Sequence, residues 1–379
     1  MTSLFFIIIL LAFYTYIGYP IFLLLFSRVK AHQIDEYFRP TVTLLVAAYN
    51  EISVIEEKMK NSLELDYPID KINFVFVSDG SDDGTTEYLY KYNNARMKVV
   101  SIFPRGGKAG ALSRGIGSSS GEIIVLTDAN TMIEKDAIKK LVRHFSSLEV
   151  GGVTGDVRIR KGKGGFGESE GMYYRIERMI QEKESDTDSV IGADGALYAI
   201  RKKLFILQDD AVILDDFVIS MNIVKSGSRV LYDPEALAYE NPTPEILQEM
   251  RRKSRVVAGG FQAIMRYHVM PTIKTPWLLF YFISHKLFRW IMPLLLIILI
   301  FLNIYIVEIR ENIIYYVLLA GQIIFYVIAS FGWIFYSRLT NKIFSIPFYF
   351  TMVNISGLWG MYKYFASKQT VVWKKATRI

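Results

Sequence analysis

Charged residues are absent from four long stretches of this chain, and this segregation constrains its fold more than any other feature. Asp, Glu, Lys and Arg are missing from residues 1–27, 291–307, 312–337 and 343–362 of the 379-residue sequence. About 20 apolar residues in a helix cross the hydrocarbon core of a bilayer, so each stretch is a candidate membrane span. The sequence therefore predicts neither a purely soluble protein nor a bundle of spans alone, because a charged region of domain size separates the first two stretches.

The first stretch, residues 1–27, predicts an N-terminal transmembrane helix. It is too long for the apolar part of a signal peptide and has no basic segment before it, although a cleaved signal peptide is the alternative. Basic residues follow it at Arg28, Lys30 and Arg39. Because basic loops favour the cytoplasm, we expect the charged region, residues 40–270, to form a domain on the cytoplasmic side of the cell membrane.

The C-terminal region, residues 275–365, predicts an interfacial segment followed by two or three transmembrane helices. Pro276–Ser284 is short and aromatic and leads into apolar spans at Phe288–Val307 and Ile313–Tyr336. The last apolar stretch, Ile343–Tyr362, either crosses the membrane or takes a re-entrant or interfacial path. Its direction stays open because the basic tail that follows, residues 366–379, favours the cytoplasmic side.

Net charge and cysteine content exclude several kinds of site. The formal charge of +7 suits an anionic ligand, membrane lipids or cytoplasmic loops, and no basic run accompanies a nucleic-acid-binding motif, so no nucleic acid partner is expected. The chain has no cysteine, which excludes disulfides and thiolate chemistry. Its four histidines do not have the spacing of zinc ligands.

Between residues 41 and 145, short β-rich runs alternate with amphipathic stretches of helical length. The predicted strands are Thr41–Ala47, Ile72–Val77, Val99–Ile102 and Ile123–Leu126. The predicted helices are Ser53–Glu64, Thr85–Tyr92, Lys108–Ser118 and Lys135–Phe145. This alternation predicts an α/β domain with a mostly parallel sheet covered on both faces, whose ligands bind beyond the C-terminal ends of the strands.

A glycine-rich segment at residues 162–167 has the spacing of a loop. It either binds phosphate or lies on the surface. Neither a dinucleotide-binding fingerprint nor a P-loop occurs, which removes the main support for a dehydrogenase or an ATPase.

Polar clusters follow the first two predicted strands. Tyr49 and Glu51 come after the first, and Asp79 comes directly after the second. Such clusters serve either as ligand sites or as turns and helix caps. Asp79 is the candidate for function, whereas Asp82 or Asp83 is expected to cap the next helix.

Two further clusters suit a nucleotide diphosphate and a metal ion. The segment from Arg105 to Gly115 includes Lys108 and several glycines, which allow a phosphate to approach the backbone closely. Asp128 and Asn130 end the fourth strand, and oxygen ligands at that spacing can share Mg²⁺ or Mn²⁺ with a diphosphate. An Asx-turn is the alternative interpretation of this pair.

The order of these clusters resembles that of the membrane-bound, inverting family 2 glycosyltransferases of bacteria, which are related to polysaccharide synthases. Gly192-Ala-Asp-Gly-Ala-Leu-Tyr-Ala-Ile-Arg201 looks like the family's acceptor-side loop, and Ile213-Leu-Asp-Asp-Phe217 looks like its base motif. Arg251-Arg-Lys-Ser-Arg-Val256 stands where the synthases carry Gln-x-x-Arg-Trp. The resemblance covers almost the whole chain and implies a GT-A domain, with a mostly parallel mixed sheet, flanked by transmembrane helices.

The resemblance also implies roles for individual residues. On the donor side, Tyr49 and Glu51 would line the nucleoside, Asp79 would accept from the base, Lys108 would face the diphosphate, and Asp128 with Asn130 would hold Mg²⁺ or Mn²⁺. On the acceptor side, Asp216 would be the general base beside Asp215, and Asp194, Arg252 and Arg255 would contact the acceptor or the leaving diphosphate.

The implied function is transfer of a hexose or N-acetylhexosamine from a nucleotide-diphosphate sugar to a lipid-linked or glycan acceptor in surface polysaccharide or glycolipid synthesis. Among such donors, a UDP-sugar is the one expected. Val256 and Arg252 replace the Trp and Gln of the processive synthases, which favours addition of one or a few sugars. The alternatives are a processive synthase and, in another class, a non-catalytic membrane receptor or scaffold. A transporter is disfavoured because the spans lack mid-depth charges.

Overall fold

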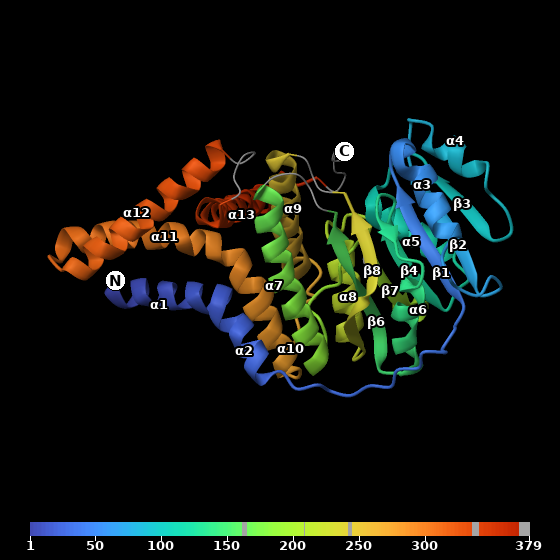
Figure 1. The fold of residues 1–379 in the computed structure, drawn as a ribbon, viewed down its shortest axis with the longest axis horizontal. Coiled ribbons are helices and arrows are strands. Elements are labelled where there is room, and N and C mark those ends of the chain that lie inside the picture. Colours follow the sequence, from blue (N-terminus) through green and yellow to red (C-terminus); the bar gives the residue numbers. More distant parts are fainter. Residues whose placement is uncertain (161–164, 208, 242–244, 336–340, 371–379) are drawn as a thin grey trace.

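An eight-stranded mixed sheet organises the charged region of the chain in the computed structural model, and long helices extend from one side of it (Figure 1). The structure describes residues 1–160, 165–207, 209–241, 245–335 and 341–370. The strands lie in the order β3-β2-β1-β4-β7-β6-β8-β5. Their bounds are β1 Val42–Ala48, β2 Ile72–Asp79, β3 Met97–Ile102, β4 Ile123–Asp128, β5 Met132–Ile133, β6 Val150–Ile159, β7 Leu197–Arg201 and β8 Arg229–Glu240.

The first half of the sheet confirms the predicted α/β alternation. Strands β3, β2, β1 and β4 are mutually parallel. The helices that follow β1, β2, β3 and β5 are α3 Ile52–Leu63, α4 Thr85–Tyr90, α5 Gly107–Ser118 and α6 Ala137–Val142. Each overlaps a predicted helix. The strands between these helices could be recognised because parallel strands buried on both faces are continuous runs of apolar residues.

The second half of the sheet makes it mixed. Strand β7 pairs antiparallel with β4 and with β6, and β6 pairs parallel with β8. Three helices belong to this half: α7 Gly165–Thr187, α8 Asp215–Lys225 and α9 Ile246–Met265. Helix α7 begins inside the glycine-rich segment predicted to be a loop, of which residues 162–164 lie outside the described residues.

The hydrophobic core is continuous between the sheet and the long apolar helices. One cluster of buried side chains joins Leu45 and Leu126 of the sheet to Phe217 of α8 and to Tyr19 and Trp290 of the apolar segments. A second cluster lies on the other face of the sheet, under α3 and α6. Because the first cluster includes residues from both ends of the chain, the N-terminal and C-terminal helices are part of the same packed unit as the domain.

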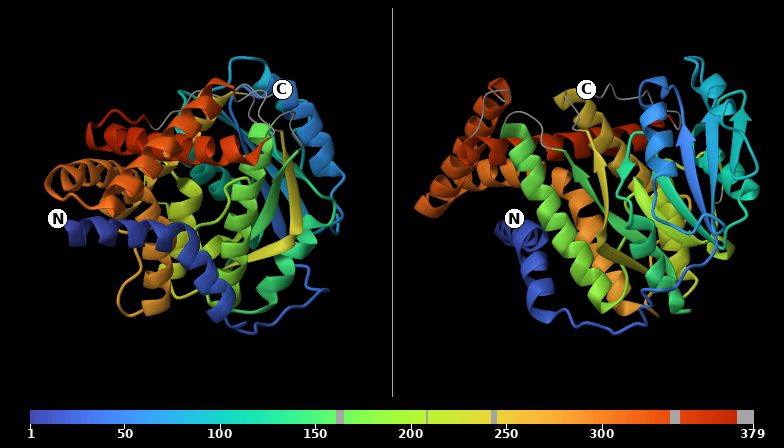
Figure 2. Two further views of the ribbon diagram at one scale, coloured as in Figure 1. Left: turned by 60° about the vertical axis from the view of Figure 1, so that its left-hand side comes forward. Right: turned by 45° about the vertical axis from the view of Figure 1, so that its right-hand side comes forward.

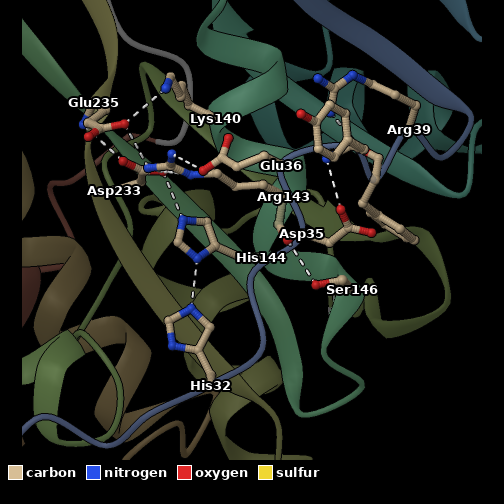
Figure 3. A network of polar contacts seen from close by, with 12 residues as sticks. His32, Asp35, Glu36, Arg39, Lys140, Arg143, His144, Ser146, Asp233 and Glu235 are labelled. Atoms are coloured by element: carbon tan, nitrogen blue, oxygen red, sulfur yellow. Dashed lines mark hydrogen bonds and ion pairs between the residues drawn. The ribbon is translucent and has the colours of Figure 1, made fainter.

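The segment between the N-terminal helix and β1 is fixed to the domain by a chain of polar contacts (Figure 3). His32 Nε2 lies 2.8 Å from His144 Nδ1, and His144 Nε2 lies 2.8 Å from Asp233 Oδ2 at the middle of β8. Arg143 Nη2 also lies 2.9 Å from that carboxylate, and Arg143 Nη1 lies 2.7 Å from Glu36 of the same segment. The connection after the first helix is therefore held against the domain.

Three helical segments of the described chain are long and apolar enough to cross a membrane: Thr2–Phe26, Pro276–Ile309 and Ile313–Ile334. The first consists of α1 Thr2–Phe13 and α2 Tyr19–Phe26 with a π-helical turn between them, Tyr14–Gly18. The second consists of α10 Pro276–Tyr281, a π-helical turn over Phe282–Leu287 and α11 Phe288–Ile309. The third is α12 Ile313–Ile334. The segment predicted to lie at the interface, Pro276–Ser284, thus continues directly into a span.

The last apolar stretch forms α13 Lys342–Phe365, which is not among these three candidate spans. Helix α13 runs across α7 and α9 at a steep angle to α1 (Figure 2). It packs so closely on α9 that a β-carbon at Gly360 would lie 2.3 Å from the carbonyl oxygen of Ser254. This packing favours the interfacial path for the stretch.

We expect Gly360→Ala to destabilise the protein because the added methyl group meets the backbone of α9. Overpacking of this kind costs about 1–3 kcal/mol, which should lower the midpoint of thermal unfolding in detergent by several degrees. Gly321→Ala in α12 is the matched control, because a β-carbon there meets no atom within 4 Å. Equal midpoints for the two variants would show that α13 does not pack on α9 in this way.

Candidate active site

Three predicted site residues lie together at the C-terminal ends of parallel strands. Asp79 ends β2, Asp128 ends β4 and Tyr49 follows β1. The register places Ala47 of β1 beside Asp128 and Ala48 beside Ser78, so the three side chains belong to one edge of the sheet. This is the edge at which parallel α/β sheets bind their ligands.

Asp79 fixes the loop that leads into α5. Its Oδ1 accepts a hydrogen bond from the amide of Gly106 at 2.7 Å, and its Oδ2 accepts one from the amide of Gly107 at 2.8 Å. The buried carboxylate therefore holds the loop over the strand end and places Lys108 in the first turn of α5. Its predicted contact with a nucleoside base stays a prediction.

The guanidinium group of Arg105 stacks on the ring of Tyr49. The guanidinium carbon of Arg105 lies 3.3 Å from the centre of the Tyr49 ring, and Arg105 Nε lies 3.6 Å from Asp79 Oδ2. A guanidinium stacked on an aromatic ring forms a flat, positively charged surface. Such a surface suits the predicted nucleoside end of the site.

Glu51 stands at the N-terminus of α3, where its amide donates to Thr85 Oγ1 at 2.9 Å. Asp83 accepts from the amide of Ile52 and, at its other oxygen, from the amide of Thr85. Gly84 is the N-cap of α4, so the expectation that Asp82 or Asp83 caps this helix is wrong, although Asp83 accepts from amides in the first turns of α3 and α4.

Lys108 connects the parallel strands to the base motif. Its Nζ lies 2.7 Å from Asp128 Oδ1 and 3.8 Å from Asp215 Oδ2. Although burial opposes the charged amine, the neighbouring carboxylates raise the pKa of Lys108. The lysine is therefore charged, and it neutralises part of the negative charge that the strand end and α8 bring together.

Asp215 and Asp216 begin α8, where the positive end of the helix dipole favours carboxylates. Burial and the neighbouring Asp215 raise the pKa of Asp216 to about 7, while Lys108 partly opposes the shift. A carboxyl group with this pKa exchanges its proton near neutral pH, as a general base requires.

The predicted acceptor-side loop packs directly on Asp216. A β-carbon at Gly195 would lie 2.4 Å from Asp216 Oδ2, and Gly192, with a φ of +94°, leaves room for the ring of Phe217. Burial raises the pKa of Asp194 in this loop to about 6, although its carboxylate accepts from the amide of Ala196. Both glycines are needed to bring the loop this close to the base.

A carboxylate of α7 holds the start of the same loop. Glu184 Oε2 accepts from the amide of Ile191 at 3.2 Å. Its Oε1 accepts from the hydroxyl of Tyr19 at 2.6 Å and lies 2.8 Å from Nδ1 of His285. Glu184 and His285 are fully buried. The loop beside the base is thus bonded to the first and second apolar segments.

The two predicted arginines of α9 have different positions. Arg255 donates to the carbonyl of Ile213 at 2.7 Å, so it supports the turn that presents Asp215. Arg252 donates to the buried Glu249 and to the hydroxyl of Tyr174. Arg252 lines the cavity described below, and its contact with acceptor or diphosphate stays a prediction.

Two site residues escaped the sequence analysis. Lys58 of α3 is fully buried behind β4, where its Nζ donates to the carbonyl of Thr131 and to Thr127 Oγ1. It thereby fixes the turn that contains Asn130. Glu240, at the end of β8, accepts from Thr131 Oγ1 at 2.7 Å. Apart from its place in an amphipathic helix, no sequence signal separates Lys58 from a solvated lysine.

The donor set at this edge suits a divalent cation that is shared with a substrate. Within the described part of the chain, no group of three or more His, Asp or Glu residues has the arrangement of a complete metal site. Asp128 and Asp215 nevertheless converge on Lys108, and the buried Oδ2 of Asp215 has no hydrogen-bond partner among the described residues. Mg²⁺ and Mn²⁺ sites of nucleotide enzymes need only one or two carboxylates, because phosphates and water complete them.

A cavity of about 300 Å³ extends from the base toward the apolar helices. Asp194, Asp216 and Glu240 line it at the sheet. Its opposite wall includes Tyr16 of the first apolar segment and Arg289 of the second. The cavity thus connects the candidate base with the helices predicted to enter the membrane.

Comparison with known proteins identifies the domain that holds the strand ends, Lys108 and Asp194. Residues 43–206 match the model of Glycosyl transferase family 2. This stretch is similar to that family and spans less than half of the chain. The base motif and α9 follow after the matched residues, so their positions rest on the structure.

Among curated proteins, the poly-beta-1,6-N-acetyl-D-glucosamine synthases of two staphylococci are similar to this chain. The Staphylococcus aureus (strain COL) synthase is 28% identical over 244 residues, which cover 62% of this chain and 58% of the synthase. The Staphylococcus epidermidis synthase is 27% identical over 251 residues, which cover 65% and 60%. The matches span less than two thirds of the length of these relatives.

Among solved structures, a mannosyltransferase from Pyrobaculum calidifontis in complex with GDP-Man and Mn²⁺ has a similar fold. Its TM-score is 0.74 at 22% sequence identity, and the match covers 97% of this chain and 100% of that one. The likeness confirms the predicted GT-A fold, and it extends to the helices that flank the domain.

Lys58→Met should change how the stability of the protein depends on pH. Burial lowers the pKa of Lys58 to about 7, against 10.5 for an ordinary lysine. As the pH falls through this window, the unfolded chain takes up a proton that the folded chain does not, so the wild type loses stability relative to the variant. The stability of the wild type minus that of the variant should be about 2 kcal/mol more favourable at pH 9 than at pH 7.

Chemical denaturation in detergent at the two pH values measures this difference. Lost hydrogen bonds to Thr131 cost the same at both values and cancel in the comparison. Lys60→Met, at an exposed lysine of the same helix, is the control and should show no such dependence. A pH-independent difference for Lys58→Met would contradict the assignment.

Proposed function

We propose that this chain transfers a hexose or N-acetylhexosamine, with inversion, from a nucleotide-diphosphate sugar to a hydroxyl group of its acceptor. A UDP-sugar is the proposed donor. One observation carries the proposal: the half-buried carboxylate of Asp216, with a pKa of about 7, lies between the Lys108–Asp128 pair and the cavity. A donor at the strand ends and an acceptor in the cavity would meet at this carboxylate.

Asp216 serves as the general base in this proposal. In inverting transfer, the acceptor hydroxyl attacks the anomeric carbon from the face opposite the leaving group, and its proton must be removed as the bond forms. Asp216 accepts this proton at its carboxylate. The close approach of Gly195 restricts where a hydroxyl group can reach that carboxylate, which favours one orientation of the acceptor.

Lys108 and Asp128 act on the leaving group. As the glycosidic bond breaks, negative charge grows on the nucleoside diphosphate, and a charged lysine fixed beside it stabilises that charge. Asp128, with Asn130, would hold Mg²⁺ or Mn²⁺, which supplies further positive charge to the diphosphate when bound. Asp79 keeps the loop before Lys108 in place through two amide hydrogen bonds.

The proposed location is the cytoplasmic membrane, with the catalytic domain on the cytoplasmic side. Three apolar helical segments and the basic residues after the first support it. Nucleotide sugars are soluble and charged, whereas the cavity leads to the apolar helices. This arrangement supports a lipid-linked acceptor and a role in surface polysaccharide or glycolipid synthesis.

A processive synthase is the second candidate, because the staphylococcal relatives are named as polymer synthases. Val256 lines the cavity where the resembled synthases carry a tryptophan, which supports addition of one or a few sugars instead. Product length decides between the two. The purified protein is incubated with labelled nucleotide sugars and Mg²⁺ or Mn²⁺, and long chains among its products would favour the processive reaction.

Asp216→Asn should abolish transfer and leave donor binding nearly unchanged, because the amide keeps the size of the side chain but cannot accept the proton. Transfer of labelled sugar and equilibrium binding of the nucleotide sugar measure the two effects. Asp70→Asn, at an exposed carboxylate of the same domain, is the control. Asp128→Ala should instead weaken metal-dependent binding.

Transfer that survives Asp216→Asn unchanged would remove the base assignment. Donor binding without transfer by the wild-type protein, across the panel of sugars and metals, would favour a non-catalytic receptor.

The rate of transfer should fall as the pH drops below about 7, since Asp216 is then protonated and cannot accept a proton. Asp215→Asn removes a negative charge that raises the pKa of Asp216, so the acidic limb of the pH–rate profile should move to lower pH. Rates under saturating donor between pH 5 and 8 measure the shift. A limb that stays in place, or moves to higher pH, would contradict the proposed coupling of the two carboxylates.

A further inference from the structure

The cavity has two chemically different ends. Its sheet end contains the carboxyl groups of Asp194, Asp216 and Glu240. Its helix end contains Lys286 and Arg289 from the start of the second apolar segment. A ligand that fills the cavity thus meets carboxyl groups, which accept hydrogen bonds from hydroxyl groups, at one end and cations at the other.

The basic side chains of the helix end, His285, Lys286 and Arg289, outnumber the two carboxylates that contact them, Glu177 and Glu184. Glu177 of α7 lies 2.6 Å from His285 Nε2 and 3.2 Å from Lys286 Nζ through one oxygen, and 2.5 Å from Arg289 Nη1 through the other. Burial alone would raise the pKa of Glu177, yet its three basic neighbours hold it well below the usual range. Arg289 Nε is buried and has no hydrogen-bond partner within the described chain. The helix end can therefore take a further anion.

Backbone geometry marks the same place. Tyr16 lies in the π-helical turn Tyr14–Gly18, and His285 and Lys286 lie in the turn Phe282–Leu287. A π-helical turn inserts an extra residue and redirects side chains, and such turns are frequent at functional sites. Here both turns bring polar side chains from apolar segments to the wall of one cavity.

The wall beyond the cations is apolar and belongs to the helices that leave the domain. Trp290 and Pro293 of α11 and Val353 of α13 line it. A ligand that reaches this wall passes from the charged domain into the region of the candidate spans. It must therefore be polar at one end, anionic in the middle and apolar at the other end.

We propose that the acceptor is an anionic amphiphile, a hydroxyl-bearing headgroup joined to a lipid through phosphate, whose phosphate binds Lys286 and Arg289. The proposal rests on the proposed function, since it places the acceptor hydroxyl at Asp216. Phosphate is favoured because guanidinium and ammonium groups together bind its oxygens strongly, and most strongly where water is excluded. A neutral glycolipid would leave the Arg289 Nε without a partner.

The test is binding of dodecyl phosphate to the purified full-length protein in phosphatidylcholine nanodiscs. Binding needs no sugar transfer, so its failure is distinguishable from failure of the proposed function. Dodecyl glucoside supplies the same chain without the charge, and inorganic phosphate supplies the charge without the chain. We expect saturable binding of dodecyl phosphate, and at least about tenfold weaker binding of both other probes.

Lys286→Gln and Arg289→Gln should each weaken dodecyl phosphate binding by about tenfold. Lys274→Gln is the matched control, because it removes an exposed cation just before α10 that does not line the cavity. If Arg289→Gln misfolds because Glu177 loses its partner, the double variant Glu177→Gln/Arg289→Gln removes both charges and should still bind weakly.

Several results would overturn the proposal. Equal binding by wild type, Lys286→Gln and Arg289→Gln would show that these cations do not hold the ligand. Equal weakening of dodecyl phosphate binding in Lys274→Gln would show that exposed cations attract this ligand to the protein surface without a specific site. Tighter binding of dodecyl glucoside would assign the cavity to a neutral lipid, and equal binding of inorganic phosphate would assign it to free phosphate.

Discussion

Lys108 makes the ion pairs on which the rest of the active site depends. It joins Asp128, at the end of a parallel strand, to Asp215, at the start of a helix from the other half of the sheet. With Asp216, three carboxylates lie near this lysine. Without a cation among them, their mutual repulsion would push the strand end and the helix apart. The same lysine also limits the rise that burial and Asp215 cause in the pKa of Asp216, so one ammonium group acts on both the ion pairs and the proton affinity of the proposed base.

The supports around this centre are backbone contacts rather than further charges. Asp79 holds the loop before Lys108 by two amides, and Arg255 holds the turn before Asp215 by a carbonyl. Gln262 of α9 adds a bond to the amide of Ile213. Helix α9 thus fixes the base motif from one side while it packs against α13 on the other.

Sequence patterns predicted the parts of the fold and site that local chemistry determines. The four parallel strands were predictable because both faces are buried and their residues are apolar throughout. Asp79 and Asp128 were predictable because they lie at strand ends, and Lys108 because it lies in a glycine-rich segment between two strands. Helix α7 was not predicted, since its many charges and the glycines before it obscure its apolar face.

Side chains whose role depends on distant partners could not be found from sequence. Lys58 and Glu177 resemble charges on solvated helix faces, and only tertiary packing buries them or surrounds them with cations. His285 follows an apolar run, and nothing nearby in the sequence indicates that two carboxylates of α7, a hundred residues earlier, meet it. The direction of the last apolar stretch likewise depended on its packing against α9.

The bond from Glu184 to the amide of Ile191 ties the loop beside Asp216 to the flanking helices. The carboxylate that holds the loop beside Asp216 is itself held by Tyr19 and His285, which come from opposite ends of the chain. A domain cut free of its flanking helices would keep the strands, Lys108 and the base motif, yet lose both partners of that carboxylate. The loop beside Asp216 therefore has its full set of contacts only when the helices on both sides of the domain are packed against it.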